Sequence, residues 1–123
     1  MGLLFNADVQ KWISKRIVMG GVKFERCRLQ YAAFEEIDLS KSSFSGCDLR
    51  DVSFRRTNLT DCSLVGSSLS NTDFAGATLD RAALTHADFD AFDLTAPISH
   101  AGLIISHDQA EKILRGLGVT VVD

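Results

Sequence analysis

Three cysteines are the residues of this chain most able to bind a metal ion or to form a covalent bond. Cys27, Cys47 and Cys62 form no CxxC pair, which is the spacing that structural zinc sites favour. Because three is an odd number, a complete set of disulfides is also excluded. The pattern predicts free thiols in a reducing compartment and no metal site.

The histidines and serines do not form a catalytic constellation either. His86, His100 and His107 share no spacing that is typical of metal ligands. Serine is abundant, but no histidine or carboxylate recurs with it at a fixed distance, and a serine nucleophile needs such a base. We therefore expect no catalytic residue, no cofactor and no enzymatic activity.

The composition narrows the class of protein further. The chain has 123 residues, of which 46% are hydrophobic, as expected for one compact domain. Its 13 Lys and Arg against 16 Asp and Glu give a formal net charge of -3, which argues against direct binding to nucleic acid. No stretch approaches the roughly 20 apolar residues of a membrane helix, and the N-terminus lacks a signal-peptide pattern. The sequence predicts a cytoplasmic protein that binds no membrane.

A five-residue repeat runs through most of the chain. Steps of five from Phe24 to Leu94 meet only Leu or Phe. The residues two places earlier form a second series, from Val22 to Phe92, in which small or β-branched side chains dominate. A period of five fits neither the 3.6 residues of a helical turn nor the alternation of a strand, so the chain must bend once in every repeat.

Each repeat is therefore a short extended segment followed by a corner. In extended chain the small residue and the Leu or Phe point to the same side, because they are two positions apart. A corner at the two following residues turns the next pair inward again, which produces a coil with a ladder of Leu and Phe inside. Leu and Phe recur in kind more often at a separation of 20 than of 15, which favours four repeats per coil. In that register Phe34, Phe54 and Phe74 share one inward column.

These repeats resemble a known family. The segments 47–51 (CDLRD), 57–61 (TNLTD) and 87–91 (ADFDA) are similar to the A(D/N)LXX consensus of the pentapeptide-repeat family. The resemblance covers residues 22–94 without a gap. It implies an all-β solenoid, namely a right-handed four-sided parallel β-helix, here of about four coils with short N- and C-terminal capping helices.

The repeat changes phase after Leu94. Segments 96–98 and 101–103 keep the small-x-large pattern if one residue is deleted, and Pro97 marks this irregularity. We therefore expect two further repeats, with Ile98 and Leu103 at the large positions.

Covers are expected at both ends of the solenoid, because open strand edges promote aggregation. Residues 1–16 are predicted to form an N-terminal capping helix, which Asn6 caps and in which Trp12 packs on the first coil. The β-helix itself is assigned to residues 17–105.

Residues 106–123 are predicted to form a C-terminal capping helix and a tail. The segment 106–109 (SHDQ) reads as a capping box at the start of this helix. Four apolar helix residues should cover the last coil: Ala110, Ile113, Leu114 and Leu117. The tail that follows has strand character and could pair with an edge of a second copy. The contacts of such a homodimer would be Leu117, Val119, Val121 and Val122.

Two outward surfaces are candidates for binding a protein partner. One side of the coil carries almost no charge above its first turn, which is typical of a docking surface. Its residues are Ser43, Ser45, Ser63, Val65 and Thr85. Aspartates gather in the later repeats and arginines in the second coil. The aspartates are Asp73, Asp80, Asp88, Asp90 and Asp93, and the arginines are Arg50, Arg55 and Arg56.

Short polar residues that precede the Leu or Phe have a structural interpretation. Their side chains can bond to backbone groups of the adjacent corner. They are Asp38, Asp48, Asn58, Asp73, Asp88 and Asp93.

The sequence favours a non-enzymatic module or scaffold for protein–protein interaction, because a filled coil presents surfaces rather than a cleft. The identity of the partner is not predicted. The family resemblance implies an alternative, a DNA-mimicking inhibitor or protector of gyrase, a type II topoisomerase, as in members of the quinolone-resistance type. This chain departs from that pattern because it is short, weakly acidic and carries the arginine cluster.

Overall fold

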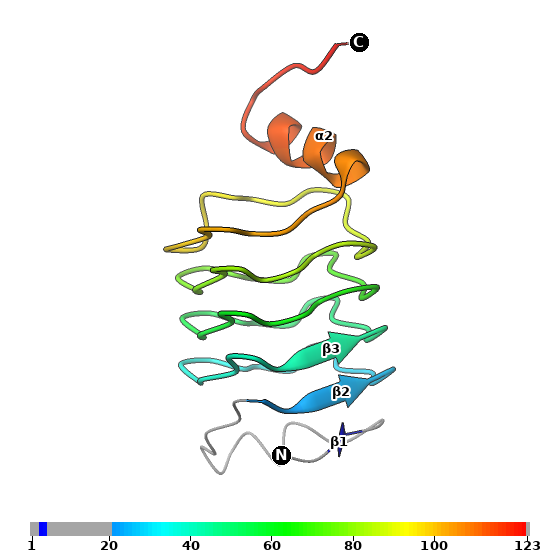
Figure 1. Ribbon diagram of the computed structural model, residues 1–123, viewed down its shortest axis with the longest axis vertical. Coiled ribbons are helices and arrows are strands. Elements are labelled where there is room, and N and C mark those ends of the chain that lie inside the picture. Colours follow the sequence, from blue (N-terminus) through cyan, green and yellow to red (C-terminus); the bar gives the residue numbers. More distant parts are fainter. Residues whose placement is uncertain (1–2, 5–20, 123) are drawn as a thin grey trace.

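The computed structural model describes residues 3–4 and 21–122 of the chain. These residues form a column of stacked coils with a helix over one end (Figure 1). The named elements are β1 (Leu3–Leu4), β2 (Lys23–Glu25), β3 (Ser43–Ser45) and α2 (His107–Gly116). The predicted N-terminal helix, with Asn6 and Trp12, lies outside the described residues.

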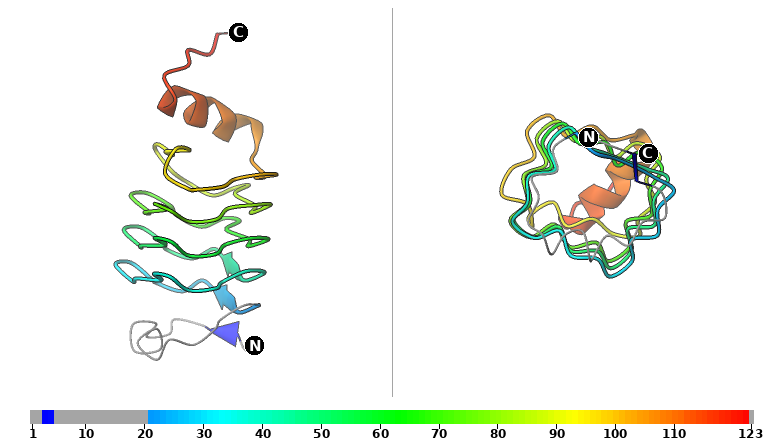
Figure 2. Two further views of the ribbon diagram at one scale, coloured as in Figure 1. Left: turned by 90° about the vertical axis from the view of Figure 1, so that its left-hand side faces the viewer. Right: turned by 90° about the horizontal axis from the view of Figure 1, so that it is seen from below.

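Parallel pairing at a separation of 20 residues defines the coil. The strands pair in the order β1-β2-β3, with Leu4 opposite Phe24 and Phe24 opposite Phe44. Isolated bridges continue the same register on the other sides, for example from Arg28 to Asp48 and from Ala33 to Ser53. Four repeats therefore complete one coil, as predicted, and the view along the axis in Figure 2 shows the four-cornered outline.

A tight turn makes each corner. The N–H of Thr57 donates to the carbonyl of Phe54 at 3.2 Å, and the same bond recurs every five residues. Every fifth residue from Gly21 to His86 has a positive φ, which is the conformation that a type II turn requires at its third residue. Gly46 and Gly66 adopt it without strain. The non-glycine corners, such as Arg56 with a φ of 55°, adopt a backbone conformation that L-residues disfavour, so the ladder must hold them there.

Phenylalanine and leucine side chains fill the interior. Phe54 stacks between Phe34 and Phe74, with ring centroids 5.3 and 5.6 Å away, and all three rings are buried. This confirms the predicted inward column. Phe24 and Phe44 stack at 4.6 Å in the neighbouring column and meet the first column edge to face. These contacts join the coils laterally as well as along the axis.

Buried hydroxyl groups in the small positions bond to the backbone of the coil below. Ser67 accepts a hydrogen bond from the N–H of Cys47 at 3.1 Å and donates to the carbonyl of Phe44. The Thr72 hydroxyl donates to the carbonyl of Leu49 at 2.8 Å. Polar residues in the small series therefore have partners inside the apolar column, as buried polar groups require.

The last coil differs from the prediction. Thr78 bridges Ser99 and Ala83 bridges Ile104, so these pairs are 21 residues apart instead of 20. Relative to the coil below, the last coil therefore contains one extra residue, and the predicted one-residue deletion is wrong. Ile98, which was expected at a large position, is 75% exposed. Leu103 and Ile105 pack against the core in the shifted register.

The helix α2 closes the column at the end opposite to β1 (Figure 1). Ser106 is its N-cap, and the Ser106 N–H donates to Oε1 of Gln109 at 2.9 Å, which confirms the predicted capping box. Ile113 is buried against the last coil, but Leu114 and Leu117 are exposed, so the predicted covering face was partly wrong.

Polar contacts attach α2 to the last coil. The amide nitrogen of Gln109, a buried residue, donates to the carbonyls of Leu84 and Ala87 at 2.5 and 3.0 Å. Lys112 Nζ donates to the carbonyl of Phe89 at 3.1 Å. These side chains reach carbonyl groups at the top of the column, above which the described chain has no further coil.

Candidate interaction surface

The small-residue face is the side of the column formed by Ser43, Ser45, Ser63, Val65, Ala83 and Thr85. Ser43 bridges Ser63, and Ser63 bridges Ala83, so these residues stack directly above one another. The N–H groups of Gly46 and Gly66 donate to the carbonyls of Val65 and Thr85, both at 3.3 Å, which holds the corner residues in the same stack. The predicted surface residues are therefore brought together.

Ile104 extends the small-residue face at its upper end, because it bridges Ala83. Its side chain is 50% exposed. Sequence reasoning missed Ile104, since the predicted deletion placed the last repeats in another register. The face is thus uncharged over three coils and ends on an exposed apolar side chain.

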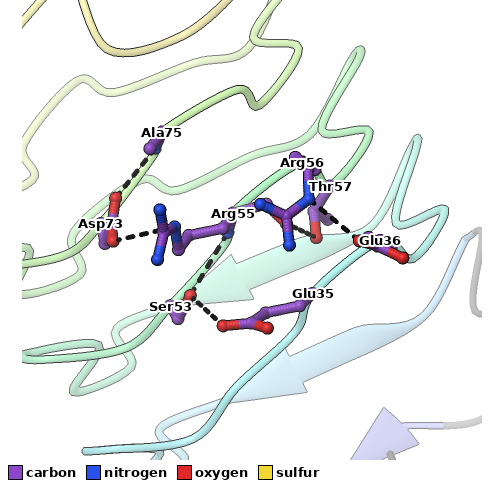
Figure 3. A network of polar contacts seen from close by, with 8 residues as sticks. All are labelled: Glu35, Glu36, Ser53, Arg55, Arg56, Thr57, Asp73 and Ala75. Carbon is purple, nitrogen blue, oxygen red and sulfur yellow. Dashed lines mark hydrogen bonds and ion pairs between the residues drawn. The ribbon is translucent and has the colours of Figure 1, made fainter.

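The arginine cluster is neutralised by acidic neighbours from adjacent coils. Arg56 pairs with Glu36 at 3.0 Å and Arg55 with Asp73 at 3.6 Å, as Figure 3 shows. Arg50 binds both carboxylate oxygens of Asp48, at 2.8 and 2.6 Å. The cluster is therefore not a free basic patch, and it connects coils through exposed pairs of small energetic weight.

The predicted acidic surface is divided between two regions. Asp80 accepts hydrogen bonds from the Ser99 hydroxyl and from the Ala101 N–H, the latter at 3.0 Å. Asp88, Asp90 and Asp93 lie on the last coil, and none of them forms an ion pair with another described residue. Arg81, which was expected among these aspartates, pairs downward with Asp61 at 2.9 Å.

The polar residues before the Leu or Phe support the corners, as predicted. Asp38 accepts a hydrogen bond from the Ser40 N–H at 2.9 Å, and Asn58, Asp73 and Asp93 accept equivalent bonds. The bond with Ser40 lowers the pKa of Asp38, and bonds from the Thr95 hydroxyl and N–H lower the pKa of Asp93. These carboxylates have a backbone role, and only Asp93 also faces an opening in the column.

The three thiols are free and buried, as predicted. Burial raises the pKa of Cys47 to about 12 and also raises the pKa of Cys62. At neutral pH both residues are therefore neutral thiols, which are poor nucleophiles and poor metal ligands. No group of three metal-binding side chains is present among the described residues.

A groove of about 450 Å³ opens between the third and last coils. Residues 69–74 line its lower side, and Asp90, Ala91, Phe92 and Asp93 line its upper side. The sequence predicted no pocket, because every small inward position was treated alike. The signal that could have revealed the groove is Phe92, an aromatic residue in the small series, together with the change of phase after Leu94.

The C-terminal segment exposes the residues that were predicted as dimer contacts. Leu117, Val119 and Val121 are exposed, and Val122 is 82% exposed. No strand is present among the described residues of this tail, so the predicted edge pairing stays a prediction.

The stacked five-residue repeats, the Phe column and the turn at every fifth residue define a pentapeptide-repeat solenoid. A comparison with protein families matches residues 37–98 to the pentapeptide repeat region. The chain belongs to the pentapeptide-repeat family.

Solved structures show the same fold. A trypsin-treated form of QnrB1, a plasmid-mediated fluoroquinolone resistance protein, is 20% identical with a TM-score of 0.71, over 82% of this chain and 48% of that chain. HetL, involved in heterocyst differentiation regulation in the cyanobacterium Nostoc sp. strain PCC 7120, is 27% identical with a TM-score of 0.58, over 83% of this chain and 42% of that chain. The chain thus spans less than half of the length of either protein. No curated protein sequence matches it.

The described part of the chain contains no helix that is long and apolar enough to span a bilayer.

Proposed function

We propose that the protein is a non-enzymatic module for protein–protein interaction and that the small-residue face is its docking surface. The observation that carries this proposal is the filled interior: the inward rings and aliphatic side chains of the regular coils, Phe24, Phe54 and Leu79 among them, are fully buried. A column packed in this way offers only its outer surfaces to other molecules. The family is in general non-catalytic, which agrees with this reading.

The small-residue face suits docking because it is flat and uncharged. Serine, alanine and threonine side chains let a partner approach the backbone closely, and little charge must be desolvated. The strands β2 and β3 run on this side, so its lower part is also its most regular.

A pair of matched arginine substitutions tests the proposal. Ser63 and Ser53 are both half-buried, and each directly precedes an inward residue on its own side of the column. We expect Ser63→Arg or Val65→Arg to abolish capture of the cellular partner in a pull-down. Ser53→Arg, which places the same charge on the opposite side between Glu35 and Asp73, should leave capture unchanged. An identical partner list for all three variants would exclude the small-residue face.

A second candidate function is inhibition or protection of gyrase by imitation of DNA. The observation in its favour is the set of Asp88, Asp90 and Asp93, which have no cationic partner among the described residues. The printed role of QnrB1 in fluoroquinolone resistance suggests the assay. If the purified protein leaves gyrase supercoiling unchanged at micromolar concentration, this function is excluded.

Self-association through the C-terminal segment is a third proposal. Leu117, Val119 and Val121 form an exposed apolar stretch beside the end of α2, and such a stretch favours contact with a second copy. Light scattering should give a dimer mass for the full chain and a monomer mass after deletion of residues 119–123. A monomer in both cases would exclude the dimer.

A further inference from the structure

The ladder of backbone hydrogen bonds opens at one place in the regular column. In the second and third coils, the N–H groups of Asp51 and Phe54 donate upward to the carbonyls of Ser70 and Asp73, at 3.2 and 2.7 Å. The Asp73 N–H donates downward to the carbonyl of Val52 at 2.9 Å. One coil higher, none of these three bonds forms between the described residues: the N–H groups of Asn71, Phe74 and Asp93 have no acceptor.

The opening is bounded on both sides by intact ladder bonds. Leu69 donates to the carbonyl of Asp88 at 2.7 Å, and Gly76 donates to the carbonyl of Ala96 at 2.9 Å. Between them the two coils separate and form the groove of about 450 Å³. The groove is therefore a window inside a closed ladder and not a frayed end.

Phe92 gives this window a structural cause. Its ring lies 5.4 Å from the rings of both Phe74 and Phe89, in a position where the coils below carry Ala32, Val52 and Thr72. The larger side chain and the extra residue of the last coil hold the two backbones apart. The regular corner also stops here, because Ala91 lacks the positive φ of His86 and the earlier corners.

Unpaired donors and acceptors face each other across the window. The lower coil offers the N–H groups of Asn71 and Phe74 and the carbonyl of Thr72, and the upper coil offers the carbonyls of Asp90 and Asp93. Unpaired backbone edges bind extended peptide segments by strand addition. A short segment that runs parallel to the coils would meet partners on both of its edges.

Charge at the rim selects the kind of segment. Asp90 and Asp93 are exposed at the groove and have no ion pair among the described residues, and Asp73 is only partly neutralised by Arg55 at 3.6 Å. Lysine or arginine side chains on the inserted segment would be attracted to these carboxylates. We propose that the groove binds a short, extended, basic segment of a partner protein. This inference rests on the proposed function, since it assumes that the protein acts by binding another protein.

Amide hydrogen exchange tests the open window in the free protein. The amides of Asn71 and Phe74 should exchange about 100-fold faster than those of Asp51 and Phe54, which occupy the same positions one coil lower and are bonded. Equal protection of the two pairs would show a closed ladder and would overturn the proposal.

Binding is tested with the acetylated and amidated peptide Lys-Val-Lys-Val-Lys. Its addition should slow exchange at Asn71 and Phe74 and shift the amide signal of Asp93. The same peptide with methylated backbone nitrogens should fail to bind, because it cannot donate to the ladder carbonyls, and Glu-Val-Glu-Val-Glu should fail by repulsion. Equal binding of the methylated peptide, or no binding of the parent peptide at millimolar concentration, would overturn strand addition.

Matched substitutions locate the site. Asp90→Asn with Asp93→Asn should weaken peptide binding at least about fivefold, whereas Asp88→Asn should have little effect, because Asp88 lies where the ladder is intact. Equal weakening by Asp88→Asn would indicate unspecific attraction and contradict the proposal. Protection of Asn71 and Phe74 that rises with protein concentration, and is lost without residues 119–123, would identify the occupant as the tail of a second copy and contradict it too.

Failure of this inference and failure of the proposed function are distinguishable. The peptide experiments probe the groove alone, and the Ser63→Arg pull-down probes the small-residue face on another side of the column. Loss of one result leaves the other intact.

Discussion

The regular coils and the last coil follow the same five-residue rule to different extents. In residues 22–88 the bridges between coils join positions 20 residues apart, and the corner residues adopt a positive φ every five residues up to His86. In the last coil one extra residue shifts the bridges to 21, and Phe92 takes the place of a small side chain. Where both conditions of the repeat hold, the ladder closes, and where both fail, it opens.

The comparison separates two sources of stability. In the regular coils each buried ring lies between rings or aliphatic chains of the coils above and below, so packing and hydrogen bonding support each other. In the last coil the packing is kept, because Phe92 is buried, while hydrogen bonds are lost. Side chains of α2 then replace part of the missing backbone pairing at the top of the column.

The largest expected effect is the loss of a central ring. Phe54→Ala removes a fully buried side chain between two stacked rings, in a column that cannot collapse around the cavity because the backbone ladder fixes the spacing of the coils. We expect a loss of about 3–5 kcal/mol in the free energy of unfolding, measured by urea denaturation.

Phe92→Val is the matched change in the last coil. Valine restores the size that Val52 has in the same column, and it lets residues 90–93 move toward the third coil. The expected cost is below about 1.5 kcal/mol, because new ladder bonds offset part of the lost burial. A loss equal to that of Phe54→Ala would show that the two regions do not differ in the way described.

Gln109→Ala tests how α2 replaces ladder bonds. The substitution leaves the carbonyls of Leu84 and Ala87 and the N–H of Ser106 without this partner, in a place where Gln109 itself is buried. We expect a loss of about 2–3 kcal/mol in the free energy of unfolding. Glu111→Ala, on the exposed side of the same helix, is the control and should cost less than about 0.5 kcal/mol. Similar losses for both would assign the effect to helix propensity alone.

Ser67→Ala tests the hydroxyl bonds of the regular coils. The substitution removes the partner of the Cys47 N–H and of the Phe44 carbonyl, both of which lie inside the column. The expected loss is about 1–2 kcal/mol. Ser70→Ala at the groove, where no side-chain bond constrains the serine among the described residues, should change the free energy of unfolding by less than about 0.5 kcal/mol. A small loss at both positions would mean that packing alone holds the small series together.

The regular column could be predicted from sequence, whereas the groove could not. A strict period of five leaves one inward direction for each Leu and Phe, so the positions of Phe34, Phe54 and Phe74 follow from spacing. After Leu94 the residues no longer distinguish a deletion from an insertion, because Ile98 and Leu103 fit the small-x-large pattern in the wrong register. Pairing with the coil below decided the register.

Surface partners were also beyond the reach of the sequence. Side chains 18 to 20 residues apart meet only once the coil is built, as Arg55 and Asp73 or Arg81 and Asp61 do. Gln109 had been recognised only as part of the capping box. Its second role, toward Leu84 and Ala87, depends on where α2 lies over the last coil.

The smallest expected effect concerns pH and compares two aspartates in equivalent places. The pKa of Asp48 in a regular coil is lowered first by its hydrogen bond with the Arg50 side chain, and that of Asp93 in the last coil by the Thr95 hydroxyl. A carboxyl whose folded pKa lies below its unfolded value stabilises the fold at neutral pH. This contribution is lost as the pH falls from about 4 through the folded pKa. Carboxyl NMR titration should therefore give both groups midpoints below about 3.9.

The consequences of protonation should differ between the two regions. Asp48 bridges Arg28 and Ser68 in the closed ladder, so Asp48→Asn should reduce the dependence of global stability on pH below about 4. Asp93 supports only the turn with Thr95 beside the open window, so Asp93→Asn should change exchange of the Thr95 amide and leave the global unfolding midpoint nearly unchanged. An equal effect of both substitutions on global unfolding would mean that the last coil unfolds together with the regular coils, as a single cooperative unit, despite its broken ladder.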